Sequence, residues 1–437
     1  MSQGYGKVGV LGYGLTGQSV VRHLLSQNIE PLVLDTRSAD QLKANTARVE
    51  LRTGVTSLRD LDLDTLVVSP GIDWRGCLMQ TLPGHVAILS DIDLFFHQAN
   101  RPVLGITGTN GKSTVTSLAG HFLNQRGLTF KVGGNLGEAA LDLLDDQADG
   151  YVLELSSFQL ERSGKLPLAA ATILNITEDH LDKHGSLDDY SQAKQRIYHH
   201  TDYAVVNRAD PRTSPASDVT VIASFGLDAP TGPDDWGLID QTIYAGANPV
   251  CDAASLSLKG AHNLVNAMAA GALVNRFVSH DAVAPMLTNF TGLAHRFETV
   301  ATINGVTCIN DSKATNVGAT IAALEGFAKD GKVVLVGGGD AKGADFGPLV
   351  EVMQGRVKYL STIGQDGGAM VQVAAEKNIQ GAYADTLEQA VADAFAQCTA
   401  GDTLLLSPAC ASIDMFANFA QRGEQFAQAV RALGEVS

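Results

Sequence analysis

Residues 103–114 read Val-Leu-Gly-Ile-Thr-Gly-Thr-Asn-Gly-Lys-Ser-Thr, and this stretch decides the fold. The apolar run Val103–Ile106 predicts a buried strand, and the pattern after the loop predicts a helix that runs to Arg126. A glycine-rich loop between a strand and a helix turns its backbone N–H groups toward an anion, and the helix N-terminus adds partial positive charge. Lys112 can then reach β- and γ-phosphates, and Ser113 can bind Mg²⁺. The stretch therefore predicts phosphate binding in an α/β sheet.

The loop departs from the usual phosphate-loop consensus at one position. The consensus has Gly five positions before the Gly of the Gly-Lys pair, and Ile106 occupies that position here. Gly105 and Gly108 lie on either side of it, so the motif is a variant. A glycine turn without a ligand is the alternative. The strand, the loop, the lysine and the helix agree with each other, which favours phosphate binding.

The same order of apolar run, turn and helical pattern recurs along the chain. It is typical of mostly parallel sheets covered by helices on both faces, so we expect an α/β fold. The first series of strands and helices ends near Ser90, and Arg101-Pro102 precedes a new strand, so we expect a domain boundary close to Asp91. Thr291–Leu293 is typical of a linker, and these breaks indicate three domains of ordinary size. They are a Rossmann-like N-terminal domain (residues 1–91), a central P-loop-type ATPase domain with a mostly parallel sheet (92–293) and a C-terminal Rossmann-like α/β domain (294–437). The other expected strands include Val8–Leu11, Leu32–Leu34, Leu66–Val68, Tyr151–Leu155, Ala171–Leu174, Ala204–Val206, Thr307–Ile309, Val333–Val336 and Thr403–Leu406.

Composition excludes several classes of function. Of the 437 residues, 31 are Lys or Arg and 47 are Asp or Glu, giving a net charge of −16. Such a surface repels polyanions, so we expect no nucleic-acid partner. The five cysteines are scattered without a Cys-X-X-Cys pair, which excludes a disulfide framework and a zinc ribbon. No apolar run approaches the ~20 residues of a membrane span. The apolar stretch near the N-terminus is broken by glycine and too short for the apolar region of a signal peptide, so we expect none. We expect a soluble, cytoplasmic monomer that acts on small molecules.

A second glycine motif, Gly12-Tyr-Gly-Leu-Thr-Gly17, follows the first expected strand and opens a helix to about Gln27. Gly12 allows the tight turn, Gly14 lets a phosphate approach the backbone, and Gly17 permits close packing of helix and strand. Asp35 ends the next strand, about 20 residues on, where a carboxylate can bind ribose hydroxyls. Three interpretations of this motif remain open at this point. It can bind a nucleotide other than NAD, it can bind NAD, or it can be a glycine turn needed only for packing.

Acidic and imidazole side chains follow two further expected strands. Glu154 lies at the end of the very hydrophobic run Tyr151–Leu155. His180 is the last residue of the stretch Asn175–His180, which follows the apolar run Ala171–Leu174. Ligands bind at the carboxyl ends of parallel strands, so both are candidates for direct or water-mediated binding of ATP-bound Mg²⁺. The alternatives are that Glu178 and Asp179 are solvated loop charges and that His180 is a hydrogen-bonded loop histidine.

Lys194 has an ordinary position. It lies on an expected helix that begins at Ser186, with Asp189 completing a pattern like a capping box. Such a lysine is usually exposed, and its position alone predicts no function.

Several loops of the third domain also follow expected strands or the linker. They are His295–Glu298, Asn310–Asn316, Gly337–Lys342 and Ser407–Ser412. Several such loops at the strand ends of one domain favour a binding role. Cys410 has no His near it in the sequence, so we expect a buried thiol rather than a nucleophile.

Taken together, the motifs Gly108–Thr114, Glu154–Leu160, Asn175–His180, His295–Glu298 and Asn310–Asn316 resemble those of the Mur ligases. These enzymes form amide bonds with ATP in peptidoglycan synthesis. The resemblance covers the whole chain, and it implies the three-domain fold.

Two stretches resemble the family members that add D-glutamate to UDP-N-acetylmuramoyl-L-alanine. They are Leu155–Glu161 and Ser407–Asp414, the second followed by Phe416 and Phe419. The Asp-Asn-Pro-Arg motif of the diaminopimelate-adding relatives is missing from the sequence. The folylpolyglutamate synthetases share the ATP domain but lack the N-terminal domain.

The resemblance also implies roles for individual residues. The UDP substrate would contact Leu15, Thr16, Asp35, Thr36, Arg37, Ser69, Pro70, Gly71, Asn135 and His180. ATP would contact Gly108, Thr109, Asn110, Gly111, Lys112, Ser113, Thr114, Asn266, Arg296 and Asp311. D-Glutamate would contact Thr315, Lys342, Ser412 and Phe419. The catalytic set would be Lys112, Glu154, His180 and Lys194, and the metal ligands Ser113, Glu154, His180 and Lys194.

Lys194 matches the position at which the family carries a carbamylated lysine. CO₂ addition to a neutral amine gives an oxygen ligand for Mg²⁺, which an ammonium group cannot be. The implied cofactors are therefore ATP, two Mg²⁺ ions and a CO₂-derived carbamate. The implied reaction passes through an acyl phosphate, and we expect the third domain to close over the second to exclude water.

Three alternatives stay open on the sequence alone. A sister Mur ligase would use another amino acid, and an NAD-linked oxidoreductase would explain Gly12–Gly17 and Asp35 but leave Gly108–Thr114 without a role. A nucleotide-binding regulator would not explain Glu154, His180 and Lys194 together. Amino-acid-dependent ATP turnover would exclude both of the alternatives outside the ligase class.

Overall fold

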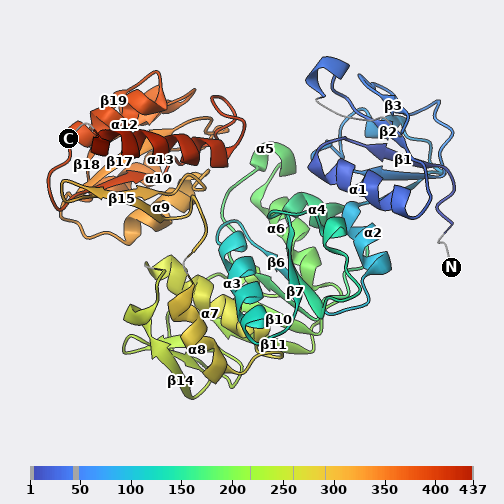
Figure 1. The fold of residues 1–437 in the computed structure, drawn as a ribbon, viewed down its shortest axis with the longest axis horizontal. Helices are drawn as coiled ribbons and strands as arrows, with labels where there is room; N and C mark the ends of the chain where they lie inside the picture. The colour runs from blue at the N-terminus through green and yellow to red at the C-terminus, as the bar shows by residue number, and fades with distance from the viewer. Residues whose placement is uncertain (1–3, 43–48, 217, 259, 291, 436–437) are drawn as a thin grey trace. The chain divides into compact units, whose positions relative to one another are not determined.

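The computed structural model describes residues 4–42, 49–216, 218–258, 260–290 and 292–435. Its strands form three sheets. Figure 1 shows the ribbon, with labels on part of the strands and helices. Contacts group the chain into two compact units: residues 1–176, 183–253 and 265–287 form the first, and 177–182, 254–264 and 288–437 form the second. In the described part of the chain, no helix is long and apolar enough to cross a membrane. The domain limits at residues 91 and 293 remain predictions.

The first sheet has five parallel strands in the order β3-β2-β1-β4-β5. Val10 in the middle of β1 pairs with Val33 and Val67 on its two sides, and all three side chains are buried. The strands and helices of this region are β1 (Val8–Leu11), α1 (Leu15–Ser26), β2 (Leu32–Leu34), β3 (Leu51–Arg52), β4 (Thr65–Val68), β5 (Ala87–Leu89) and α2 (Asp91–Gln98).

The central sheet has nine strands in the order β14-β13-β12-β11-β10-β9-β6-β8-β7. The strands from β7 to β12 pair in parallel, whereas β12, β13 and β14 pair in antiparallel fashion. The strands are β6 (Val103–Thr107), β7 (Phe130–Gly134), β8 (Gly150–Glu154), β9 (Ala170–Ile173), β10 (Tyr203–Asn207), β11 (Val221–Phe225), β12 (Trp236–Ile239), β13 (Thr242–Ala245) and β14 (Asn248–Asp252). The helices are α3 (Lys112–Gln125), α4 (Ser157–Arg162), α5 (Leu181–His184), α6 (Leu187–Gln195), α7 (Ala261–Val274) and α8 (His280–Asn289).

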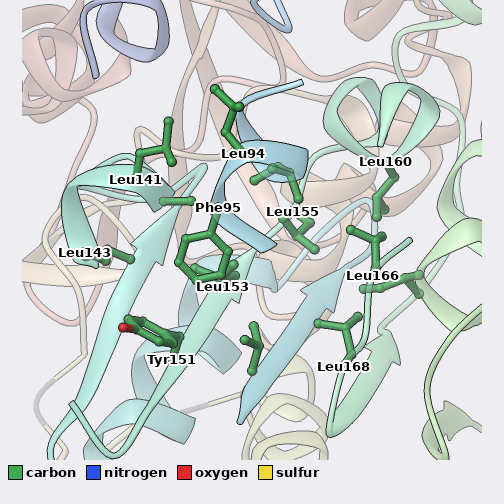
Figure 2. Packing of buried hydrophobic residues seen from close by; sticks show 14 of the residues in the cluster. Leu94, Phe95, Leu141, Leu143, Tyr151, Leu153, Leu155, Leu160, Leu166 and Leu168 are labelled. Atoms are coloured by element: carbon green, nitrogen blue, oxygen red, sulfur yellow. The ribbon is translucent and has the colours of Figure 1, made fainter. Parts of the chain in front are cut away.

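The core beside β8 shows how helix α2 is held. Tyr151, Leu153 and Leu155 alternate along the chain and enter one buried cluster (Figure 2). Phe95 of α2 meets the Tyr151 ring edge-on, with ring centroids 5.1 Å apart. Ser90 is the N-cap of α2, and its side chain accepts a hydrogen bond from the Asp93 N–H in a capping box. The apolar face of α2 is therefore buried against the central sheet.

The third sheet has six strands in the order β15-β16-β20-β17-β18-β19, all parallel except β15. Val333 and Leu335 of β17 pack into one core, and Val334 and Val336 pack into another. Both faces of the sheet are thus covered, as the continuous apolar runs predicted. The elements are β15 (Glu298–Ile303), β16 (Val306–Asn310), α9 (Val317–Glu325), β17 (Val333–Gly338), α10 (Gly347–Met353), β18 (Val357–Ile363), α11 (Gly367–Glu376), β19 (Gln380–Tyr383), α12 (Leu387–Ala396), β20 (Thr403–Leu406) and α13 (Phe419–Glu435).

Asp91, the first residue of α2, gives the fold a pH dependence. Its side chain is buried, and its Oδ2 accepts a 3.3 Å hydrogen bond from Gln159 Nε2. Burial raises the pKa of Asp91 to about 6, although the hydrogen bond from Gln159 and nearby backbone N–H groups act in the opposite direction. Between about pH 4 and 6 the folded chain holds a proton that the unfolded chain releases, so stability falls as the pH rises.

We therefore expect Asp91→Asn, which cannot ionise, to gain stability relative to the wild type between about pH 4 and pH 7. The Tm difference should grow by roughly 2–5 °C, corresponding to about 2–3 kcal/mol, measured by thermal melts across this range. The exposed Asp60→Asn is the control and should parallel the wild type. A Tm difference between Asp91→Asn and the wild type that stays constant with pH would contradict the prediction.

Candidate active site

The strand–loop–helix unit of residues 103–125 has the geometry of an anion site. β6 ends at Thr107, and α3 begins at Lys112 with Gly111 as its N-cap. Gly108 has a φ of +146° and Gly111 a φ of +84°, conformations that side-chain-bearing residues rarely adopt. The Lys112 Nζ donates to the carbonyl oxygens of Gly108 and Thr109, each at 2.8 Å. The lysine is therefore held over the loop, beside the N-terminus of a 14-residue helix.

Asn175, the residue that opens the Asn175–His180 stretch, fixes this loop. Its Oδ1 accepts from the Asn110 N–H at 2.8 Å, and its Nδ2 donates to the Asn110 carbonyl at 3.0 Å. Its own carbonyl accepts from the Thr109 N–H at 2.9 Å. Sequence reasoning assigned this residue no role of its own. The available signal was an amide side chain directly after a strand that neighbours β6.

Glu154 lies at the end of β8, which pairs with β6. It is 1% exposed, and its two carboxylate oxygens have different partners. Ser113 Oγ donates to Oε2, and Asn135 Nδ2 donates to Oε1 at 2.9 Å. The Asn135 N–H also donates to the Glu154 carbonyl at 2.8 Å. The structure thus joins three of the predicted site residues, Ser113, Asn135 and Glu154.

The oxygen atoms of this cluster suit a magnesium ion bound with a nucleotide. Mg²⁺ prefers oxygen ligands and is usually held by one or two carboxylates together with substrate phosphates and water. Ser113 supplies a hydroxyl and Glu154 a carboxylate beside the phosphate loop. Among the described residues, no three His, Cys, Asp or Glu side chains gather in a metal-binding group. One hydroxyl and one carboxylate beside the phosphate loop are what an ion needs when a nucleotide and water supply its other ligands.

Lys194 lies at this site and is buried, contrary to its ordinary position in the sequence. Helix α6 begins after Ser186, whose side chain accepts from the Asp189 N–H as expected. The Lys194 Nζ donates to the Gly108 carbonyl at 2.9 Å and lies 3.5 Å from Thr107 Oγ1. It also lies 4.4 Å from the centroid of the Tyr190 ring. Both Lys112 and Lys194 thus donate to Gly108.

Asn266 on α7 lies against the same loop. A Cβ atom built on Gly111 would come within 2.4 Å of the Asn266 Oδ1. Of the residues predicted for ATP, the structure therefore brings Asn266 to the 108–114 segment.

The glycine loop after β1 is built on a second turn, which follows β4. Gly12 has a φ of +92°, and the Ser69 Oγ donates to its carbonyl at 2.7 Å. Gly17 lies so close to the Gly12 carbonyl that no side chain fits there. Leu15, at the start of α1, is 82% exposed, so an apolar side chain stands at the mouth of this loop.

Asp35 directly follows β2 and orients the same loop. Its Oδ2 accepts from the Tyr13 N–H at 2.7 Å, and its two oxygens accept from the Arg37 guanidinium at 2.8 and 2.9 Å. Burial alone would raise the pKa of Asp35, but the hydrogen bonds from Arg37 and Tyr13 outweigh it and lower the pKa to about 2. The carboxylate is thus ionised and ties the glycine loop to Arg37.

In the second unit, Asp311 follows β16 and is an unusual carboxyl group. Its Oδ2 accepts from Ser407 Oγ at 2.9 Å, and its Oδ1 accepts from the Phe297 N–H at 3.2 Å. Burial raises the pKa of Asp311 to about 7, against these hydrogen bonds and the charges of Arg296 and Arg422. The structure therefore places Asp311 close to Arg296, two residues predicted for the nucleotide.

The loops predicted for the amino acid lie at the carboxyl ends of neighbouring strands. The loops after β17 and β20 pair with each other, because Asp340 and Ala411 exchange backbone hydrogen bonds of 3.1 and 2.8 Å. Lys342, with a φ of +52°, follows this pair on one loop, and Ser412 follows it on the other. The adjacent β16 leads to Thr315, whose N–H donates to the Lys313 carbonyl at 2.8 Å.

Phe419 begins α13 beside the same loops. The Lys313 Nζ lies 4.1 Å from the centroid of its ring, and Ser312 Oγ donates to its carbonyl at 2.7 Å. Sequence reasoning missed Arg422, one turn later, which is fully buried. It donates to the carbonyls of Ser312 and Cys410 at 2.8 and 3.1 Å. An arginine in an amphipathic helix usually lies in solvent, so the sequence held no signal for it.

His180 belongs to the second unit, in the segment 177–182. It has a φ of +54°, and its Nε2 lies 3.8 Å from the Asp179 carboxylate. Asp179 also accepts from Asn316 Nδ2 at 3.3 Å. Cys410 is buried, and burial raises the pKa of its thiol to about 12, which supports the expectation that it is not a nucleophile.

Three protein-family models match successive parts of the chain. A Mur ligase MurD-like N-terminal domain matches residues 6–86, a Mur ligase middle domain matches 106–274, and a Mur ligase glutamate ligase domain matches 295–410. The matches follow the order of the three sheets.

Full-length relatives are also similar in sequence. The UDP-N-acetylmuramoylalanine--D-glutamate ligase of Shewanella oneidensis is 45% identical over 436 residues, covering 97% of this chain and 98% of the relative. The enzyme of the same name from Escherichia coli K12 is 43% identical over 438 residues, with the same coverage of both chains.

Solved structures show the same fold at lower sequence identity. A pseudomurein peptide ligase from Methanothermus fervidus has a TM-score of 0.65 at 17% identity and covers 98% of this chain and 100% of its own. The UDP-N-acetylmuramate-alanine ligase of Thermotoga maritima has a TM-score of 0.64 at 18% identity, covering 98% of this chain and 99% of its own. These likenesses confirm the predicted three-domain α/β fold.

Proposed function

This chain belongs to the Mur ligase family, and we propose that it joins D-glutamate to UDP-N-acetylmuramoyl-L-alanine in an ATP-dependent reaction. The observation that carries the proposal is the gathering of Lys112, Ser113, Glu154 and Lys194 around one strand–loop–helix unit. The full-length similarity to D-glutamate ligases selects the substrate pair within the family. It makes a sister ligase with another amino acid, or an NAD-linked oxidoreductase, a poorer explanation of the chain.

We assign the residues of the 108–114 loop to the phosphates of ATP. The N-terminus of α3 and the loop N–H groups would bind the anion. The Lys112 ammonium group now donates to two loop carbonyls, and it could donate to phosphate oxygens instead when ATP binds. Asn266, beside Gly111, is a further proposed contact of the nucleotide. Arg296 and Asp311, which lie close to each other, are assigned to the nucleotide on the family resemblance.

Ser113 and Glu154 would hold Mg²⁺ together with His180 and a carbamylated Lys194. When bound, Mg²⁺ supplies positive charge to the phosphoryl group in transfer. The burial of Lys194 supports the carbamate, because a carbamate shielded from bulk water is protected from loss of CO₂. We propose that two Mg²⁺ ions bind here and that Lys194 carries a carbamate.

The UDP part of the acyl substrate would bind at the glycine loop of the first sheet. Leu15 offers an exposed apolar surface to the base, and Thr16 and Arg37 offer donors to the phosphates. The turn of Ser69, Pro70 and Gly71, whose Ser69 hydroxyl donates to the Gly12 carbonyl, would form the other side of this site. Asp35 and Thr36, directly after β2, would complete it. Asn135 and His180 would meet the muramoyl end.

D-Glutamate would bind at the loops of the third sheet. Its two carboxylates need cationic and hydroxyl partners. Lys342 and the hydroxyls of Thr315 and Ser412 supply them, and the Phe419 ring supplies an apolar wall.

The reaction would proceed in two steps. A carboxylate oxygen of the alanyl group attacks the γ-phosphorus of ATP, and the bond to the β-phosphate oxygen breaks to give an acyl phosphate and ADP. The amine of D-glutamate then attacks the acyl carbon, loses a proton, and inorganic phosphate leaves as the amide forms. Lys112 would stabilise charge on the transferring group, since catalysis of phosphoryl transfer rests mostly on positioning and electrostatics.

We place the reaction in the cytoplasm. All five cysteines are free thiols in the structure, which supports a reducing compartment.

Phosphate release from ATP tests the proposal. With UDP-N-acetylmuramoyl-L-alanine, Mg²⁺ and bicarbonate present, we expect release only when D-glutamate is added. L-Glutamate and the omission of amino acid are the two controls. Release with another amino acid in place of D-glutamate would move the chain to a sister activity, and no release under any condition would overturn the ligase assignment.

A further inference from the structure

Arg162, the last residue of α4, lies between the central sheet and the UDP-site turn of the first sheet. Its Nη1 donates to the Ser69 carbonyl at 2.5 Å, and its Nη2 donates to the Ile72 carbonyl. A planar guanidinium presents two donors in a fixed fork, so it can hold both carbonyls of one turn at once. Arg162 therefore reaches out of the central domain and fixes the turn of residues 69–72.

The contact continues from this turn into the glycine loop. Ser69 Oγ donates to the Gly12 carbonyl at 2.7 Å, and the Ile72 N–H closes the turn on the Ser69 carbonyl at 3.1 Å. A Cβ atom on Gly12 would meet Ser69 Cβ at 2.9 Å and Ile72 Cγ1 at 3.2 Å. The glycine loop thus rests directly on the turn that Arg162 holds.

The side chain of Arg162 is partly buried, and no other arginine takes its place on the turn in the described residues. Burial lowers the pKa of Arg162, against the charges of Glu161, Asp91 and Asp73. The two regions are also joined by Arg22, which contacts Asp142 at 2.7 Å, and by Arg75, which contacts Glu161 at 2.7 Å. Arg22 and Arg75 form ion pairs with carboxylates. Arg162 instead donates to the carbonyls of Ser69 and Ile72 in the turn.

We propose that Arg162 is a positioning residue for the UDP-linked substrate, acting through the Ser69–Ile72 turn on the glycine loop. The inference rests on the proposed function, because it takes the first sheet as the UDP site. Arg162 touches neither the phosphate loop nor the D-glutamate loops in any hydrogen bond described for it. Its loss should therefore weaken the binding of one substrate out of three.

The test is a comparison of steady-state kinetics for Arg162→Met, Arg162→Lys and the wild type. We expect Arg162→Met to raise the KM for UDP-N-acetylmuramoyl-L-alanine by roughly 10- to 100-fold, because two charge-assisted hydrogen bonds are lost. The KM values for ATP and D-glutamate and the kcat should stay within about 3-fold of the wild type. Arg162→Lys keeps the charge without the fork, so it should recover only part of the loss.

Arg22→Met is the matched control, because it removes another arginine contact between the same two regions and leaves the turn intact. Its KM for the UDP substrate should stay near the wild-type value. Calorimetric titration of the wild type with UDP-N-acetylmuramoyl-L-alanine distinguishes a failure of the proposed ligase function from a failure of the role proposed for Arg162. If the wild type neither binds this compound nor turns over, the proposed function fails. If it does both and Arg162→Met keeps the wild-type KM, or raises all three KM values equally, the role of Arg162 is refuted.

Discussion

Replacement of Lys112 by Met should reduce ATP-dependent phosphate release by about 10³-fold or more, equivalent to about 4 kcal/mol of lost transition-state stabilisation. The reason is geometric as well as electrostatic. The Lys112 Nζ is held by the carbonyls of Gly108 and Thr109 above the N-terminus of α3. No other side chain of the 108–114 loop carries a positive charge. The measurement is single-turnover phosphate release with saturating substrates.

Asn124→Ala provides the matched control for Lys112. Asn124 lies at the far end of the same helix and makes two hydrogen bonds with the Phe130 backbone, at 2.8 and 3.1 Å. Its loss should lower the Tm while leaving turnover within a few-fold of the wild type. If Lys112→Met retained more than about a tenth of the wild-type rate, the assignment of Lys112 to the transferring phosphate would be wrong.

Replacement of Lys194 by Ala or by Arg should reduce turnover by on the order of 10²- to 10³-fold. Both variants remove the amine that would carry CO₂, and Arg keeps the positive charge, so equal losses would separate carbamylation from simple charge. The wild type stripped of CO₂ should lose activity and regain it with bicarbonate. The direct measurement is a carbamate carbon signal after incubation with ¹³C-bicarbonate.

That signal should be present in the wild type and missing in Lys194→Ala. The exposed Lys165→Ala is the control and should keep both the signal and the activity. Full activity of the wild type without CO₂, or full activity of Lys194→Arg, would rule out a functional carbamate.

Local sequence patterns were sufficient to predict the strand–loop–helix unit and most strand positions. The expected helix to about Gln27 ends at Ser26, and the helix to Arg126 ends at Gln125. Such features depend on glycine, on caps and on the period of apolar residues, all of which act over a few positions. Glu154 was found in the same way, because it directly ends a buried strand.

The rest depends on contacts that no local pattern encodes. Lys194 meets the Gly108 carbonyl across 86 positions, and Arg162 meets Ser69 across 93. Both pairs are set by the order of strands in the sheets and by the packing of helices on them. A buried lysine or arginine has the same sequence signature as an exposed one. Lys194 was assigned to the site only through the resemblance to the Mur ligases, because its position in the sequence predicted no function.

We propose that the loops of Lys342 and Ser412 bind the amino acid, and the pairing of Asp340 with Ala411 then bears on how such a protein can change its amino-acid preference during evolution. Because the loops that carry Lys342 and Ser412 share two backbone hydrogen bonds, neither can shift without the other. A substitution that changes the shape of one loop would disturb these hydrogen bonds to the other loop until a second, compensating substitution arises there. Selectivity at this end of the chain would then diverge through linked pairs of substitutions, and single replacements would mostly reduce fitness.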